Sequence, residues 1–583
     1  MRYDYVIAGG GSAGSTLAAR LSEDPSKKVC LLEAGGDGKD LLIRAPAGII
    51  ALLPGRPKIN NWGFETVPQE GLGGRRGYQP RGKALGGSSA INAMLYTRGN
   101  RRDYDEWADL GCDGWSWDEV LPYFRRAEGN QRGTDALHGG DGPLRVAEQQ
   151  EPRPIAKAFV EACGENQIRR NEDFNGPEQE GAGLYQVTQF WGERRNGERC
   201  SAAAAYLHPA FGRPNLTVVT GAHATGVWLD GKRAKGVRYR IGRGEAVAEA
   251  RREVILCGGA FGSPQLLLLS GIGPAVELAA HGIPLVHELP GVGRNLQDHL
   301  DFILAWKSRE TDLMGIGLTG MPGLIKHMLR WRKDGTGMIA TPYAEAGAFL
   351  KSDPAIERPD LQLHFCIAIV DDHGRKLHMG YGFSCHVCVL RPYSRGEVGL
   401  MSADPLAPPR IDPRFLQDER DADLLLKGVR MTRAILEAPA LAKYRKKEIY
   451  TAGAASDAEL MAHIRARADT IYHPAGTCKM GVDDMAVVDP MLRVRGLEGL
   501  RVVDASVMPT LVRRQHQRAH DHDRGEGRGH DPRGRLIAAS WSDQGDRFSL
   551  SLASIAGLLT GSSLSGQTTY AICTSPYVVL TLG

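Results

Sequence analysis

The fold is decided by the stretch YVIAGGGSAGSTLAARL at residues 5–21. Residues 5–8 form a short apolar run, long enough for one buried parallel strand. The glycine-rich turn at 9–14 follows at once, and the apolar residues after it have the spacing of one helix face. A second apolar strand is expected at 29–32. The order of strand, turn, helix and strand predicts an α/β fold with a dinucleotide-binding unit at its start.

Each glycine of the turn has a separate expected task. Gly9 permits the tight turn, Gly11 lets backbone N–H groups approach a pyrophosphate, and Gly14 lets the helix lie close to the strand. Glu33 ends the second strand, where a carboxylate can accept from both hydroxyls of an adenosine ribose. The motif alone does not choose between FAD and NAD. The residues expected to bind the cofactor here are Gly9, Gly11, Ser12, Ala13, Gly14, Glu33 and Ala34.

Bulk composition excludes several classes of protein. A length of 583 residues predicts two or more domains, and 42% hydrophobic with 24% charged residues is typical of a soluble globular chain. A net charge of +4 is too small to indicate nucleic-acid binding. The ten cysteines have no framework spacing, which favours a reducing compartment. No apolar stretch is long enough to span a bilayer, and the early first strand leaves no room for a signal peptide. We expect a cytoplasmic location, with any membrane contact peripheral on the cytoplasmic membrane.

A second glycine-rich loop lies at 82–92. Its adjacent glycines and serines expose several backbone N–H groups and hydroxyls, a nest suited to a phosphate or a flavin ring. A plain surface loop is the alternative. The residues added to the cofactor site from this region are Gly86, Gly87, Ser88, Asn92 and Ala93.

The middle of the chain predicts several further elements. Residues 107–144 lack a clear period and are expected to be irregular, and Ser201 is a candidate helix cap. Asp230-Gly231 is a good hairpin turn, and Pro264 after Ser263 fits a helix start. Strands are expected at 215–220, 224–229, 236–240 and 253–257.

The composition changes from about residue 303. Strands at 361–370 and 382–391 and a helix at 422–437 predict a second domain of α+β type built on an antiparallel sheet. Cys385 and Cys388 form a lone C-x-x-C. Because side chains at i and i+3 of a strand face opposite sides, these sulfurs are expected in the core, and no metal site is predicted.

The pair His473-Pro474 is the candidate catalytic element. Pro474 restricts His473 to extended backbone, and a histidine held on such a loop is a plausible general base. A structural His-Pro pair is the alternative. A later strand of the nucleotide domain is expected to end near Asp504 and Ala505, which complete the predicted cofactor site.

Taken together, these motifs resemble the glucose-methanol-choline (GMC) flavin oxidoreductases. The matching stretches are 9–33, 85–92, 259–273, 473–481 and 504–506. The resemblance implies FAD along the first domain, and His473 as the base that takes an alcohol's hydroxyl proton while the α-carbon gives a hydride to flavin N5. Some members attach FAD through a histidine where this chain has Ile91, so non-covalent FAD is expected. The FAD-binding parts are expected at 1–150, 201–302 and 461–512, and the substrate-domain parts at 151–200 and 303–460.

The substrate and the electron acceptor remain open at this point. A primary aliphatic alcohol needs only an apolar pocket, whereas choline needs an aromatic or carboxylate cage for its trimethylammonium group. Trp306, Tyr343, Glu345 and Phe365 are candidates for lining either pocket. The electron acceptor could be oxygen, a quinone or another carrier, and the resemblance favours a quinone. A lyase or an inactive flavoprotein is the alternative from another class.

The tail at 513–583 departs from the resemblance. The family continues with a segment like GGNTNAPTIMIAEK, whereas this chain has RRQHQRAHDHDRGE at 513–526. His516, His520, His522 and Asp523 could be metal ligands, but the crowding Gly and Arg favour disorder over a metal site. The codons of this stretch, read one base later, can spell the family's segment. We therefore interpret 513–583 as the product of a surplus base near codon 513, with Gln517 in the place of the family's second asparagine.

Overall fold

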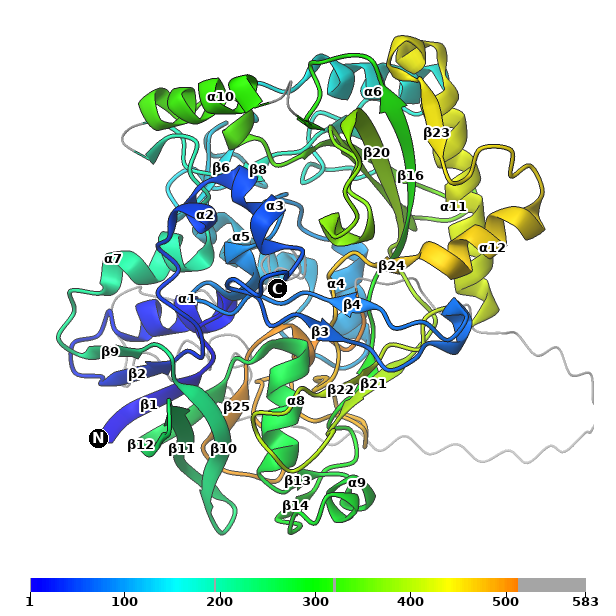
Figure 1. Ribbon diagram of the computed structural model, residues 1–583. Coiled ribbons are helices and arrows are strands. Elements are labelled where there is room, and N and C mark those ends of the chain that lie inside the picture. The colour runs from blue at the N-terminus through cyan, green and yellow to red at the C-terminus, as the bar shows by residue number, and fades with distance from the viewer. Residues whose placement is uncertain (1, 193–194, 318–320, 512–583) are drawn as a thin grey trace, which may run out of the picture.

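The computed structural model describes residues 2–192, 195–317 and 321–511 (Figure 1). The tail at 513–583, with its expected disorder and shifted reading frame, lies outside these residues. The helices with their bounds are α1 Ser12–Leu21, α2 Leu41–Arg44, α3 Ile49–Leu52, α4 Arg101–Asp109, α5 Trp117–Ala127, α6 Pro154–Glu165, α7 His208–Ala210, α8 Gly259–Leu269, α9 Ala275–Ala280, α10 Met321–Asp334, α11 Glu419–Glu437 and α12 Asp457–Arg467.

The first sheet has seven strands in the order β10-β11-β12-β1-β2-β9, with β25 also paired to β12. The pairs β1/β2, β2/β9, β1/β12 and β12/β25 are parallel, as the opening stretch predicts. Helix α1 packs against this sheet, and one large apolar core lies between them. The bounds are β1 Arg2–Ala8, β2 Val29–Leu32, β9 Leu216–Val219, β10 His223–Asp230, β11 Arg233–Ile241, β12 Gly244–Leu256 and β25 Leu500–Val502.

The predicted hairpin is confirmed, because β10 and β11 are antiparallel on either side of Gly231. The predicted strand at 253–257 is only the end of β12, which begins at Gly244. Its first half is mostly exposed and mixes glycine, alanine and valine with glutamate, so no long apolar run marks it. Ser201 directly precedes Ala202, the residue at the start of the π-helical segment Ala203–Leu207, and its hydroxyl accepts from the backbone N–H of Ala204 at 3.2 Å.

Pro264 does not start a helix, which corrects the prediction. Helix α8 begins at Gly259 and contains Pro264. A proline there removes the N–H that would bond the carbonyl of Ala260. The Thr477 hydroxyl donates to that carbonyl at 2.6 Å instead. A residue far away in the sequence therefore satisfies the group that the proline leaves free.

The stretch at 107–144 is not irregular throughout, which is a second correction. It contains all of α5, whose N-terminus is closed by a capping box of Ser116 and Glu119. The pattern S-x-x-E was the available signal.

The second sheet has eight antiparallel strands in the order β23-β16-β20-β19-β18-β7, with β17 and β24 joined at its sides. Helices α6 and α11 pack on it over a second apolar core. The mixed α/β class with an antiparallel second sheet is thus confirmed. The bounds are β7 Gly181–Leu184, β16 Leu300–Ser308, β17 Gly315–Ile316, β18 Ala344–Leu350, β19 Leu361–Cys366, β20 Gly380–Val389, β23 Lys447–Ile449 and β24 Asp469–Thr470.

The described residues also form four short sheets. Their strands are β3 Phe64–Glu65 with β4 Tyr78–Gln79; β5 Glu128–Asn130 with β6 Leu144–Ala147 and β8 Val187–Thr188; β13 Ile272–Gly273 with β14 His287–Glu288; and β15 Arg294–Leu296 with β21 Gly396–Gly399 and β22 Arg410–Asp412. Cys385 and Cys388 are fully buried on β20, so their prediction as core residues is confirmed.

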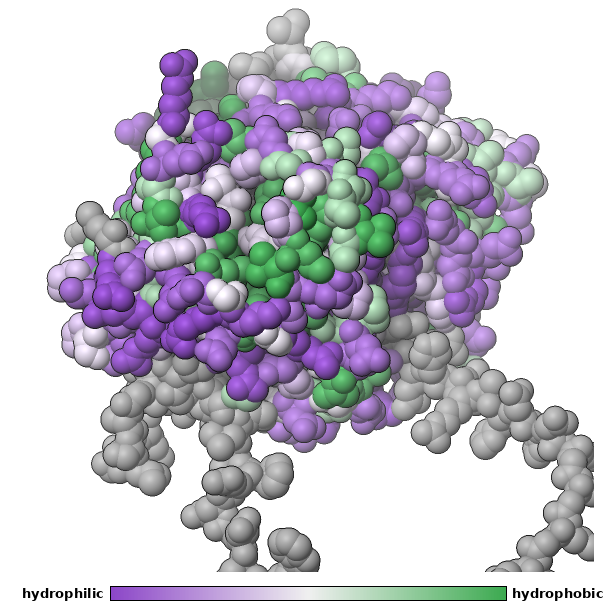
Figure 2. Space-filling model, turned by 90° about the horizontal axis from the view of Figure 1, so that it is seen from below, coloured by the Kyte–Doolittle hydropathy of each residue, from purple (hydrophilic) through white to green (hydrophobic). Residues whose placement is uncertain are grey.

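The surface mixes polar and apolar residues. The face seen from below is largely hydrophilic, with hydrophobic residues gathered near its middle (Figure 2). Within the described part of the chain, no helix combines the length and the apolar character needed to cross a bilayer.

Candidate active site

A cavity of about 910 Å³ lies where β1 gives way to α1. The glycine turn, the end of β2 and the second glycine loop form part of its wall. Ten of the predicted cofactor residues line it, namely Gly9, Gly11, Ser12, Ala13, Glu33, Ala34, Gly87, Ser88, Asp504 and Ala505.

The glycines of the turn are placed as the motif predicts. Gly9 has φ +107°, and a Cβ there would lie 2.3 Å from the carbonyl oxygen of Cys257. A Cβ on Gly14 would lie 1.9 Å from the oxygen of Gly9, so only glycine allows this contact between helix and strand. A Cβ on Gly11 would meet nothing closer than 3.9 Å. Because Gly11 lines the cavity, a side chain there would fill space that a cofactor needs.

Glu33 is held by backbone groups beside the turn. Its Oε2 accepts from the N–H of Gly10 at 2.8 Å, and its Oε1 accepts from the N–H of Gly35 at 2.7 Å. Burial raises the pKa of this carboxyl to about 7. A carboxylate offers about four acceptor positions, so about two remain beyond these bonds. These free acceptor positions fit the hydroxyl donors of a ribose.

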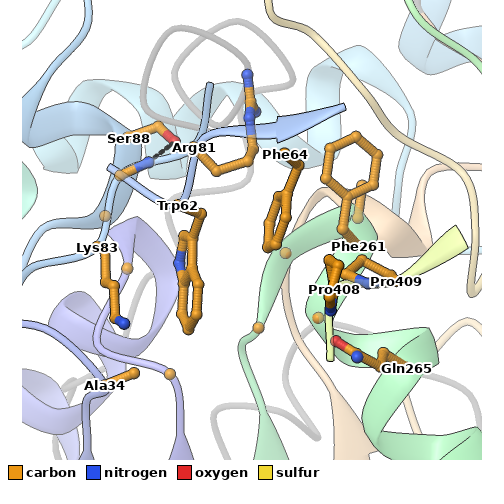
Figure 3. A pocket seen from close by; sticks show the side chains of 18 of the residues that line it. Ala34, Trp62, Phe64, Arg81, Lys83, Ser88, Phe261, Gln265, Pro408 and Pro409 are labelled. Atoms are coloured by element: carbon orange, nitrogen blue, oxygen red, sulfur yellow. Dashed lines mark hydrogen bonds between the residues drawn. The ribbon is translucent and has the colours of Figure 1, made fainter. Parts of the chain in front are cut away.

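The second glycine loop packs directly on the first. The N–H of Gly86 donates to the oxygen of Gly10 at 2.8 Å, and a Cβ on Gly87 would lie 2.8 Å from the Cα of Gly11. Ser88 accepts from the N–H of Gly82 at 3.0 Å, as Figure 3 shows. Gly87 is buried, so the alternative of a plain surface loop is wrong.

Asp504 caps α8 at the edge of the same cavity. Its Oδ2 accepts from the N–H of Gly259 at 2.9 Å and from the hydroxyl of Ser263 at 2.6 Å, while its Oδ1 accepts from the N–H of Ser506 at 2.8 Å. The strand β25 brings Asp504 to this place, as the sequence predicts. The contacts of its carboxylate within the chain are therefore structural.

Aromatic residues on the cavity wall were missed by sequence reasoning. Trp62 and Phe64 stack with their ring centroids 5.5 Å apart, and the ammonium of Lys83 lies 4.3 Å from the Trp62 ring centroid. Figure 3 shows these rings opposite Phe261 and Pro408. Residues 61–65 carry no periodic pattern or motif that would have identified them.

A smaller cavity of about 210 Å³ meets the large one. Arg81 and Ser88 line both, and His473 lines the small cavity while Pro474 lines the large one. Most of its wall is apolar, and no Asp or Glu is among its described lining residues. The apolar side chains include those of Ile49, Leu53, Ile91, Met94, Leu95, Met314, Ile369 and Ile471.

The remaining predicted residues divide between the cavities and the core. Asn92, Ala93 and Tyr343 line the small cavity. Gly14 and Gly86 line neither cavity and act through packing. Trp306, Glu345 and Phe365 do not line the small cavity: the two aromatic rings belong to the second core, stacked on Phe383 and Phe159.

His473 is buried at the junction, with 7% of its surface exposed. The backbone N–H of His473 donates to Asp298 Oδ1 at 2.9 Å, and the ring nitrogen Nδ1 of His473 lies 3.0 Å from Nδ1 of His299. Burial, then the neighbouring His299, His364 and Arg81, hold the pKa of His473 well below the ordinary 6.5. The imidazole is therefore neutral at physiological pH.

His299, His364 and Arg81 are further residues that sequence reasoning missed. His299 ends the stretch 291–299 that reads only as a polar turn, and burial lowers its pKa to about 3. His364 lies in the middle of β19, where a polar residue among apolar neighbours was the available signal. Tyr472 has φ +78°, and strained backbone of this kind beside a histidine is typical of functional sites.

Two buried donors in the small cavity, the amide of Asn92 and the hydroxyl of Tyr343, have no partner within the described residues. The amide Nδ2 of Asn92 makes no hydrogen bond, while its Oδ1 accepts from Arg199 at 2.8 Å and from the N–H of Met94 at 3.0 Å. Buried donors are normally satisfied. A flavin ring carries acceptor atoms on its edge, so the orphaned amide of Asn92 fits the cofactor that the sequence predicts.

Comparison with known proteins identifies the family of the chain. A GMC oxidoreductase profile for the N-terminal part matches residues 3–301, and one for the C-terminal part matches residues 392–517. An alcohol dehydrogenase [acceptor] from Pseudomonas putida is 48% identical over 518 residues, covering 88% of this chain and 92% of that protein. An oxygen-dependent choline dehydrogenase from Burkholderia multivorans is 45% identical over 517 residues, covering 88% and 90%.

Solved structures agree as well. Pyridoxine 4-oxidase from Mesorbium loti superposes with a TM-score of 0.78 at 34% identity, covering 88% of this chain and 95% of that one. The formate oxidase of Aspergillus oryzae, studied for its FAD modification, has a TM-score of 0.80 at 27% identity, covering 88% and 94%. The chain therefore belongs to the GMC oxidoreductase family, whose members are FAD-dependent enzymes acting on CH–OH donors.

Proposed function

We propose that the chain oxidises a primary aliphatic alcohol to its aldehyde, with His473 as general base and FAD as cofactor. One observation carries the proposal: a neutral, buried imidazole lies where the glycine-lined cavity meets an apolar one. When bound, FAD supplies a hydride acceptor. The glycine turn, Glu33 and the loop at 86–88 would hold it.

The base would act through a defined nitrogen. Nδ1 of His473 is engaged with His299, so Nε2 remains for the hydroxyl proton of the substrate. Removing that proton makes the α-carbon a far stronger hydride donor, so the base and the acceptor must reach one substrate together. The Asp298 contact fixes the backbone at the histidine and so orients its ring.

The wall of the small cavity favours an alkanol over choline. A trimethylammonium group needs a carboxylate or an aromatic cage. Of the four sequence candidates only Tyr343 lines this cavity. The carboxylate of Glu345 instead accepts from the hydroxyl of Thr341 at 2.8 Å and from the N–H of Arg153 at 2.6 Å. The relative named alcohol dehydrogenase [acceptor] supports the alkanol, and the choline dehydrogenase relatives keep choline as the second candidate.

The cofactor and the acceptor belong to the same proposal. Ile91 lines the small cavity and carries no nucleophile, so FAD is proposed to be bound non-covalently. Acid precipitation of the purified protein should release all of its flavin into the supernatant. A quinone is proposed as the electron acceptor, in keeping with the resemblance.

The altered tail bears directly on activity. The family places a hydrogen-bonding residue from the segment after Val512 beside the catalytic histidine. Losing one preorganised donor of this kind costs about 2–4 kcal/mol in the transition state. We propose that removing one base near codon 513 restores the segment. The gain in kcat should then be about 30-fold to 10³-fold.

The test is an anaerobic titration of the flavin absorbance, run on this chain and on the frame-restored chain. Straight-chain alcohols from ethanol to octanol and choline are added in turn. Each added CH₂ that enters the apolar cavity contributes about 0.8 kcal/mol, so kcat/KM should rise about fourfold per CH₂ until the cavity is full. A flavin-loaded, frame-restored chain that no alcohol bleaches would exclude the oxidation and leave a lyase or an inactive flavoprotein.

A further inference from the structure

Helix α10 turns its apolar side chains outward. Ile325, Met328 and Leu329 have the i, i+3, i+4 spacing of one helix face. Their exposed fractions are 54%, 50% and 64%. A surface helix of a globular protein normally buries such a stripe. Here the stripe faces solvent.

Polar contacts fix this orientation. Trp331, at the edge of the stripe, donates from Nε1 to the oxygen of Gly197 at 2.9 Å, and Arg330, on the opposite face of the helix, forms an ion pair with Glu151. His327 accepts from the N–H of Met338 at 3.3 Å. The helix is therefore anchored by its polar side and cannot bury the apolar one by rotating.

The same side of the molecule carries the mouth of the small cavity. Ile50, Ile316 and Leu377 line that cavity and yet are 53%, 41% and 65% exposed, which places them at its opening. Met379, 66% exposed, pairs with Ile316 across a short bridge. Helix α10 contacts the turn at 338–340, which contacts the turn just before α3, and Figure 1 shows α10 on the side of α2 and α3.

The charges around this stripe are mainly positive. Lys326, Arg332 and Lys333 are exposed on α10, and Lys376 precedes Leu377. The carboxylate of Asp334 is engaged by the hydroxyl of Thr336 at 2.6 Å. Exposed apolar side chains on a helix that is rich in Lys and Arg are typical of segments that lie in the interface of an anionic bilayer.

We propose that this surface docks on anionic lipid membranes. The α10 surface is defined by Ile50, Ile316, Ile325, Met328, Leu329, Leu377 and Met379. Docking turns the opening of the apolar cavity toward the lipid, where an aliphatic alcohol partitions. The choice of substrate rests on the proposed function, whereas the docking itself does not.

The test is co-sedimentation of the full chain with vesicles. Vesicles of phosphatidylcholine alone are compared with an equimolar mixture of phosphatidylcholine and phosphatidylglycerol. The wild-type chain should bind the anionic vesicles, and the double variant Met328→Asp/Leu329→Asp should bind at least about tenfold more weakly. Both positions are exposed, so the variant should keep its far-ultraviolet circular dichroism and its flavin content.

Val276→Asp is the matched control. Val276 is 84% exposed on α9, which Figure 1 shows at the other end of the molecule, and this variant should bind vesicles as the wild type does. Unchanged binding by the α10 variant, or no wild-type binding to anionic vesicles, would overturn the proposal. If the wild-type chain forms a dimer and does not bind vesicles, and the α10 substitutions convert that dimer to a monomer, the surface would instead be an interface with a second copy of the chain. Each readout is independent of turnover, so it separates failed docking from failed alcohol oxidation.

Discussion

The two cavities that meet at His473 and Pro474 differ in what forms their walls. The large one is lined by glycines, and so by backbone, at the glycine turn, the second glycine loop and the start of α8. The small one is walled by side chains from β19, β20 and distant loops. The shape of a backbone wall depends on which positions must be glycine. The shape and chemistry of a side-chain wall depend on the size and polarity of its side chains. The first kind of wall therefore tolerates few substitutions, while the second can change its ligand without loss of the fold.

The largest effect should follow from Gly9→Ala. At φ +107° and with a Cβ 2.3 Å from the Cys257 oxygen, any side chain forces the turn apart. We expect a loss of about 4 kcal/mol or more in the free energy of unfolding, and a preparation without flavin. Thermal unfolding and the flavin-to-protein absorbance ratio measure both. Gly36→Ala is the control, because a Cβ there meets nothing within 4 Å. A stable Gly9→Ala protein that still binds flavin would show that the glycine-lined wall tolerates substitution as well as the side-chain wall does.

His473→Gln tests the junction and should affect turnover alone. Removing a general base typically costs about 10²-fold to 10⁴-fold in kcat, while the flavin content should stay unchanged. Because the pKa of His473 lies well below 6.5, the wild-type base stays unprotonated as the pH falls through 6.5. Wild-type kcat/KM should therefore show no loss centred there. His463→Gln on α12 is the matched control. A variant that keeps its activity would refute the role of His473.

Thr477→Val should have the smallest effect. It leaves the carbonyl of Ala260 without the hydroxyl that compensates for Pro264, at a cost of about 1–3 kcal/mol. Chemical denaturation measures the loss, with the exposed Thr311→Val as control. If the double variant Pro264→Ala/Thr477→Val recovers this loss, the helix has regained its own hydrogen bond. Equal losses in the single and double variants would mean that the hydroxyl does not replace that bond.

The large cavity could be predicted from the sequence because its determinants are local. The strand, turn, helix and acid at 5–33 lie within one short segment, and each glycine has a steric reason to be there. The roles of these residues toward FAD remain predictions. Local pattern fails where a distant residue decides the outcome. Pro264 lies inside α8 and not at its start, and the hydroxyl of Thr477, far away in the sequence, satisfies the carbonyl that the proline leaves free.

The small cavity could not be predicted because it is assembled by sheet register. His364 on β19 lies opposite His386 on β20, and His299 directly precedes β16. Nothing in the spacing of these histidines along the chain places them near His473. Candidates chosen by residue type alone, such as Trp306 and Phe365, proved to be core residues. The capping box of α5 is different, because the local pattern S-x-x-E at 116–119 is enough to predict it.

The pairing of β12 has a consequence for biosynthesis. One edge of this strand is shared, since β11 pairs with residues 244–249 and β25 pairs with Val254, Ile255 and Leu256. The ribosome makes β25 only after nearly all of the described chain has emerged. Until then an apolar strand edge stays open to other chains, and open edges invite aggregation. Premature termination before residue 500 should therefore yield insoluble product rather than a smaller folded protein.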